Sequence, residues 1–138
     1  MSWAVEIEPG LWQGEWPRTP DDVAPWATLV NCCAECPDPA VPGKVWITVP
    51  MVDDGQWAPD PVLLTAVVRM VRAAPAPVLV HCGMGRSRST AVLVAILRDR
   101  HRDWDAATAI TCVRRVNPEA NPNPALWAAV TAWSPPTD

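Results

Sequence analysis

Residues 77 to 97 of this 138-residue chain read PVLVHCGMGRSRSTAVLVAIL. The apolar run from Pro77 to Val80 has prolines before it and glycines after it, which is typical of a central strand buried on both faces. From about Arg88 onward, the small and aliphatic residues predict a largely buried helix. The sequence therefore predicts a strand, a glycine-rich loop over 82–87 and a helix in direct succession.

The segments on either side of this unit predict further strands and helices. Short strands are expected around residues 5–7, 11–14, 28–32 and 45–49. Helices are expected near 23–26 after a helix-start signal over 19–22, over 61–73, from Asp103 or Asp105 to about 116, and from Asn123 onward. This order predicts an α/β fold with a central, mostly parallel twisted sheet of about four to five strands, flanked by helices on both faces. We expect one domain over 1–134 and a frayed tail over 135–138.

The distribution of charge limits the classes of partner. Eleven Lys and Arg against fifteen Asp and Glu leave a net charge of −4, which argues against binding to nucleic acid or to an anionic membrane. Residues 1–60 carry two bases and ten acids (2 − 10 = −8), whereas residues 61–138 carry nine bases and five acids (9 − 5 = +4). Any anion-binding chemistry is therefore expected in the second half of the chain.

The N-terminal residues and the cysteines indicate a cellular compartment. No apolar run approaches the roughly 18 residues of a membrane span, and the start of the chain lacks the basic residues of a secretory signal. We therefore expect a cytoplasmic protein. Its five cysteines, an odd number, argue for reduced thiols and against a disulfide framework.

The loop after the central strand has the composition of an anion-binding cradle. Cys82 follows the strand, and Arg88 opens the helix six residues later. Backbone N–H groups of the loop, the positive end of the helix and a guanidinium fork can together hold phosphate oxygens. The residues expected to line this cradle are Gly83, Met84, Gly85, Arg86, Ser87 and Arg88.

A thiolate in such a field is a candidate nucleophile, and Cys82 is therefore the expected catalytic residue. Attack on phosphorus requires a proton donor for the leaving oxygen, and Asp53 and Asp54, next to Gly55, are the candidates. Ser89 is expected to hydrogen-bond Cys82 when the sulfur leaves. His81 is expected to orient the loop through a hydrogen bond to the backbone.

Other motif readings are weaker. The loop lacks the third glycine of a dinucleotide fingerprint and the Gly-Lys-Ser/Thr ending of a nucleotide P-loop. Cys33 and Cys36 have the spacing of a zinc or redox pair, but no second pair or nearby histidine completes four metal ligands.

Residues 81–89 resemble the signature of the cysteine-dependent protein tyrosine phosphatase superfamily: His-Cys, two residues, Gly, two residues, Arg, then Ser or Thr. Residues 7–14 are similar to the opening hairpin of its compact dual-specificity branch, residues 49–55 to its general-acid loop, and residues 117–126 to the entry of its C-terminal helix. The resemblance implies a dual-specificity phosphatase-like fold.

The resemblance also implies a two-step mechanism without metal or cofactor. Cys82 would form a cysteinyl-phosphate, and Arg88 with the backbone of 83–88 would bind the phosphate. Asp54 would be the general acid, in preference to Asp53, because compact members often carry the acid directly before this glycine. Some relatives also place a second cysteine near position 33, so Cys33 is either a redox partner for Cys82 or ordinary core packing.

The substrate stays open at this level. Phosphotyrosine and phosphoserine or phosphothreonine proteins are the first expectation. A basic residue at Arg86 leaves phosphoinositides and other phosphate esters possible. A non-catalytic phosphate-binding module, a sulfurtransferase or redox enzyme, and an RNA phosphatase are the competing readings, and the oligomeric state is not predicted.

Overall fold

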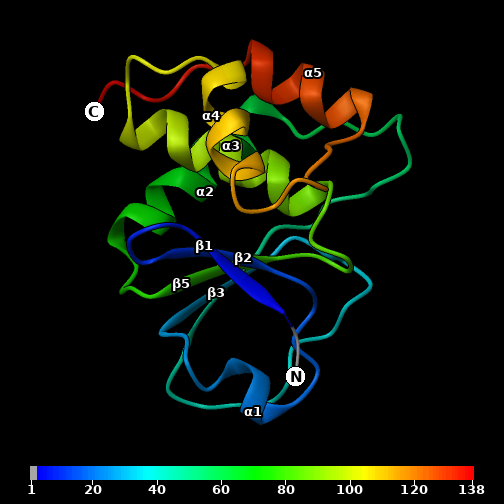
Figure 1. Ribbon diagram of the computed structural model, residues 1–138, viewed down its shortest axis with the longest axis vertical. Helices are drawn as coiled ribbons and strands as arrows, with labels where there is room; N and C mark the ends of the chain where they lie inside the picture. Colours follow the sequence, from blue (N-terminus) through cyan, green and yellow to red (C-terminus); the bar gives the residue numbers. More distant parts are fainter. Residues whose placement is uncertain (1–2) are drawn as a thin grey trace.

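The computed structural model describes residues 3–138, and its centre is a five-stranded sheet (Figure 1). The strand order is β1-β2-β5-β3-β4, with β1 and β2 antiparallel and every other neighbouring pair parallel. The predicted mostly parallel α/β sheet is therefore confirmed. The strands are β1 (Ala4–Glu8), β2 (Leu11–Gly14), β3 (Thr28–Asn31), β4 (Val45–Thr48) and β5 (Val78–His81).

Helices cover the two faces of the sheet unequally. Four lie together above one face and the short α1 lies alone below the other (Figure 1). The four are α2 (Pro61–Ala73), α3 (Arg88–Arg100), α4 (Ala106–Arg114) and α5 (Pro124–Ala132), and α1 spans Pro20–Val23. The crowded face holds the larger core, with α3 in contact with β5, α2, α4 and α5.

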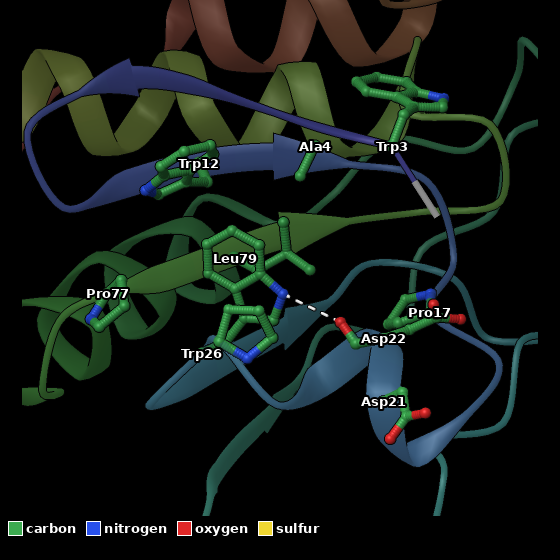
Figure 2. Close-up of a pocket in the computed structure, with 10 residues that line it drawn as sticks. Trp3, Ala4, Trp12, Pro17, Asp21, Asp22, Trp26, Pro77 and Leu79 are labelled. Atoms are coloured by element: carbon green, nitrogen blue, oxygen red, sulfur yellow. Dashed lines mark hydrogen bonds between the residues drawn. The ribbon is translucent and has the colours of Figure 1, made fainter. Parts of the chain in front are cut away.

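The face below the sheet holds a smaller aromatic cluster around Leu79. The rings of Trp12 and Trp26 meet at a centroid distance of 5.2 Å, and the Trp26 indole N–H donates to the Asp22 carbonyl (Figure 2). A cavity of about 450 Å³ opens beside them. The Trp3 ring turns away from this cavity toward the other side of β1 (Figure 2).

Side-chain caps explain where most helices begin. Asp60, Asp105 and Asn123 each accept a backbone N–H from the first turn of α2, α4 and α5. The structure selects Asp105 over Asp103 as the cap of α4. By contrast, α3 starts after Ser87 with no side-chain cap. The first N–H groups of α3 are therefore not satisfied by a cap, as in an anion-binding helix terminus.

One local expectation differs from the structure in part. The expected helix start at residues 19–22 is confirmed, because Thr19 forms a capping box with Asp22, but the helix ends at Val23 and does not extend over the predicted 23–26. The tail over 135–138 has no helix or strand, and the Asp138 carboxylate lies 2.8 Å from the Arg69 guanidinium.

His81 ends the central strand as a fully buried side chain. Neither ring nitrogen finds a hydrogen-bond partner among the described residues, so the expected bond to the backbone is absent there. Burial lowers the pKa of His81 from 6.5 to about 4, because the charged imidazolium would lose its hydration. The residue is neutral at physiological pH and acts as core.

We predict that His81 makes the folded chain sensitive to mild acid. Between its unfolded pKa of 6.5 and its folded pKa of about 4, the unfolded chain binds a proton that the folded chain does not. The stability contributed by neutral His81 is present above pH 6.5 and is lost as the pH falls toward 4. Urea unfolding should show wild type losing about 2 kcal/mol more than His81→Asn or His81→Gln between about pH 7 and about pH 5. Equal losses in wild type and both variants would contradict this assignment.

Candidate active site

The loop over 82–87 joins the end of β5 to the start of α3 and forms the floor of a cavity of about 510 Å³. Gly85 allows the chain to turn there, because its φ is +70°. A Cβ at Gly85 would lie 2.7 Å from the Trp3 ring and 2.9 Å from the Gly14 carbonyl oxygen. The cavity is lined by Asp53, Cys82, Gly83, Met84, Arg86, Ser87, Arg88, Glu119, Asn121, Asn123 and Pro124.

Cys82 lines this cavity as a nearly buried side chain. Its Sγ lies at a hydrogen-bond distance of 3.2 Å from Ser89 Oγ, as the sequence predicted for these two residues. Ser89 Oγ also accepts a hydrogen bond from Gln13 Nε2 at 3.0 Å. In this structure the Cys82 thiol is the donor to Ser89 Oγ. Because Gln13 uses only a lone pair of Ser89, the hydroxyl proton can turn toward the sulfur once the thiol has lost its proton.

A buried polar network below the loop was not found from the sequence. Asn117 Nδ2 donates to both Gln13 Oε1 and the Gly85 carbonyl, each at 2.9 Å. Gln13 Nε2 also donates to Thr90 Oγ1, whose hydroxyl donates to the Arg86 carbonyl at 2.8 Å. Gln13 is the residue that could have indicated this network from the sequence. It is polar, yet it lies two positions after buried Leu11 and therefore on the same face of β2.

Arg88 is held by Glu35, which the sequence also did not single out. The Arg88 side chain is only 9% exposed, and its Nη1 donates to both carboxylate oxygens of Glu35, at 2.8 and 2.9 Å. This hydrogen bonding holds the pKa of Glu35 below its usual value. Among the described residues, no hydrogen bond reaches Nε or Nη2 of Arg88, and Nη2 lies 3.6 Å from the position of a Cβ on Gly83. The Nε–Nη2 edge therefore remains available for a bidentate anion at the loop.

The two candidate acids lie in different environments. Asp53 lines the cavity, and its Oδ1 accepts hydrogen bonds from Ser87 Oγ at 2.9 Å and Asn123 Nδ2 at 2.6 Å. Asp54 does not line it; its Oδ1 accepts the backbone N–H groups of Gln56 and Trp57. These two hydrogen bonds also lower the pKa of Asp54.

The preference for Asp54 over Asp53 therefore does not agree with the geometry. Adjacent residues in this loop point apart, and the turn that begins at Asp54 uses its carboxylate for local backbone contacts. Asn123, which ties Asp53 to the start of α5, was anticipated as a helix cap but not as a site residue.

The rim of the cavity carries the rest of the loop. Met84 is exposed, and Arg86 forms an ion pair with Glu119 at 3.0 Å. Ser87 Oγ accepts the backbone N–H of Asn123 at 3.0 Å while its own hydroxyl donates to Asp53. Ser87 thereby links the phosphate-binding loop to both the Asp53 loop and α5.

The cysteines near the site correct two expectations. Cys33 is joined to Cys36 in a disulfide, so it is not a free redox partner for Cys82, and the cysteines are not all reduced thiols. The free cysteine beside Cys82 is Cys32, which directly follows β3 and whose backbone N–H donates to the His81 carbonyl at 2.8 Å. Burial and the neighbouring Cys82 raise the pKa of the Cys32 thiol, so it remains protonated.

Two classes of feature are missing from the part of the chain that the structure describes. Residues 3–138 contain no group of three His, Cys, Asp or Glu side chains arranged to hold a metal ion. Nor does any helix within that range have the length and apolar character needed to cross a membrane.

Comparison with known proteins gives a consistent family. Residues 19–135 match the family model described as dual specificity phosphatase, catalytic domain. Human dual specificity phosphatase 28 is 37% identical over 105 residues, which cover 72% of this chain and 57% of that protein. The mouse protein of the same name is 38% identical over 105 residues, covering 72% of this chain and 61% of its own length. This chain thus spans about three fifths of the length of these curated relatives.

The structure agrees with this comparison. A crystal structure of human DUSP28 superposes with a TM-score of 0.73 at 31% identity, covering 92% of this chain and 89% of that chain. The resemblance carried by residues 81–89 is confirmed by these matches. This chain belongs to the dual specificity phosphatase family.

Proposed function

We propose that this chain is a cysteine-dependent phosphatase that hydrolyses phosphomonoesters, on phosphotyrosine and phosphoserine or phosphothreonine proteins, through a cysteinyl-phosphate intermediate. The observation that carries the proposal is the combination of a thiol and a free guanidinium edge at one cavity floor. Cys82 supplies the thiol, and the Nε–Nη2 edge of Arg88 has no other hydrogen-bond partner among residues 3–138. Family membership supports the same reaction.

In the first step, the phosphate group of the substrate enters the loop over 83–88 and meets the uncapped start of α3. Arg88 binds two of its oxygens through the free edge, while Glu35 keeps the guanidinium plane in place from the other side. Cys82 Sγ attacks phosphorus and the ester P–O bond breaks. Asp53, which lines the same cavity, protonates the leaving oxygen.

In the second step, water hydrolyses the cysteinyl-phosphate, and the P–S bond breaks to release the Cys82 thiolate and inorganic phosphate. Asp53, now deprotonated, accepts the proton of the attacking water, as microscopic reversibility requires. The Ser89 hydroxyl, 3.2 Å from Sγ, donates a hydrogen bond to the departing thiolate. The Gln13–Asn117 network supports this step by holding Ser89 and the Gly85 carbonyl.

We predict that Cys82→Ser abolishes turnover of p-nitrophenyl phosphate measured with EDTA and a thiol reductant. A serine hydroxyl at this position lacks the thiolate that attacks phosphorus. Cys112→Ser is the matched control, because Cys112 lies on α4 and does not line the cavity. Turnover that survives in Cys82→Ser, or its absence in folded wild type, would contradict the proposal; the second result would indicate a non-catalytic phosphate-binding module.

We predict that Asp53→Asn lowers kcat about 100-fold or more for a substrate with a poor leaving group, such as phenyl phosphate. The loss should be much smaller for p-nitrophenyl phosphate, whose leaving group needs little protonation. Asp54→Asn, the matched control, should change kcat less than about threefold for both, because Asp54 is bonded to its own turn. A larger loss in Asp54→Asn than in Asp53→Asn would return the general acid to Asp54.

A further inference from the structure

Residues 83–88, which form the proposed phosphate-binding segment, contain two arginines, and each one pairs with a glutamate from a different segment. Arg88 pairs with Glu35, which follows β3. Arg86 pairs with Glu119, which lies between α4 and α5. Both Arg86 and Glu119 line the cavity, so their ion pair forms part of its rim.

The Glu119 pair differs from the Glu35 pair in its exposure. The side chains of Arg86 and Glu119 are 49% and 66% exposed, whereas Arg88 is only 9% exposed. Arg88 is buried at the proposed phosphate-binding site, whereas Arg86 and Glu119 lie at the exposed rim of the cavity. The charges of the Arg86–Glu119 pair would therefore interact with the groups next to the transferred phosphate.

The backbone keeps Glu119 over Arg86. Asn121, two residues after Glu119, donates its backbone N–H to the Arg86 carbonyl at 2.7 Å. Arg114, at the end of α4, donates from Nε to the Ala120 carbonyl at 2.9 Å. The first contact joins the segment that carries Glu119 to the loop, and the second joins it to the end of α4.

The charges at the cavity mouth then favour one class of substrate. Each guanidinium group at the site already has a carboxylate partner: Arg86 pairs with Glu119, and Arg88 pairs with Glu35. A second negative group on the substrate therefore meets no unpaired cation at the rim, and it comes close to the Glu119 carboxylate. A neutral or basic residue next to the phosphorylated residue of the substrate meets no such repulsion.

We infer that Glu119 is a specificity-determining residue that neutralises Arg86 and selects phosphorylated residues with neutral or basic neighbours. This inference rests on the proposed phosphatase function. It assigns the substrate class as phosphopeptides flanked by Lys or Arg, in preference to acidic phosphopeptides and to esters with a second phosphate nearby. Arg86, despite its place in the loop, does not serve as a free anchor for a second phosphate.

Two phosphotyrosine peptides that differ only in flanking Lys or Glu residues test this inference. Wild type should show the higher kcat/KM for the Lys-flanked peptide. Glu119→Gln should shift the ratio of the two kcat/KM values about three- to tenfold toward the Glu-flanked peptide, because it frees the charge of Arg86. The shift should shrink at high salt, as expected for an exposed pair.

Two variants separate a charge effect from a structural one. Glu119→Asp keeps the charge and should retain most of the wild-type ratio. Asp103→Asn removes one exposed carboxylate beyond the far end of α3 and should leave the ratio unchanged. Turnover of p-nitrophenyl phosphate should be nearly equal in wild type and Asp103→Asn, and in the Glu119 variants it should remain dependent on Cys82.

The outcomes distinguish this inference from the proposed function. An unchanged ratio in Glu119→Gln, with Cys82-dependent turnover intact, would overturn the role of Glu119 alone. A wild-type preference for the Glu-flanked peptide, or for a soluble inositol bisphosphate over the Lys-flanked peptide, would also overturn it. Loss of Cys82 dependence would instead overturn the proposed phosphatase reaction.

Discussion

The burial of α3 is the constraint on which the site depends. This helix is enclosed by the sheet and by α2, α4 and α5, and eleven of its thirteen residues are buried. The helix cannot slide or rotate without exposing apolar surface or breaking close packing. Because β5 is buried as well, both ends of the loop over 82–87 are fixed by the core. The apolar interior therefore positions Cys82 and Arg88, although neither residue contributes much apolar surface.

The buried start of α3 needs polar partners, and other segments supply them. Ser89 and Thr90 are buried hydroxyls, and each one accepts from Gln13 on β2. Buried polar groups without partners would cost stability, whereas a fully connected network stiffens the region around it. Asn117 extends the network to the Gly85 carbonyl and so joins the floor of the loop to the segment after α4. The loop is therefore held from below by hydrogen bonds and from its two ends by packing.

The sequence predicted the parts of this arrangement that follow from local pattern. The apolar run before Cys82 identified the central strand, and the spacing from Cys82 to Arg88 identified the loop and the helix that follows. The contacts of Glu35 and Asn117 join residues far apart in the chain, and no periodicity indicates them. Asp53 and Asp54 are adjacent in an irregular loop, so only the folded turn distinguishes their directions. The odd number of cysteines predicted reduced thiols and so missed the Cys33–Cys36 disulfide, although the spacing of these two residues fits a redox pair.

Arg88 is buried and is also proposed to bind phosphate, and it can do both because different guanidinium nitrogens serve the two contacts. A guanidinium that is 9% exposed would be costly without a countercharge, and Glu35 supplies one through Nη1. If Glu35 bonded to Nε and Nη2 instead, an arriving phosphate would have to displace it. Because Glu35 uses Nη1 alone, the resting site keeps its charge balanced while the phosphate-binding edge stays open. Glu35 is mostly exposed, so its carboxylate remains hydrated and solvent weakens its attraction for Arg88.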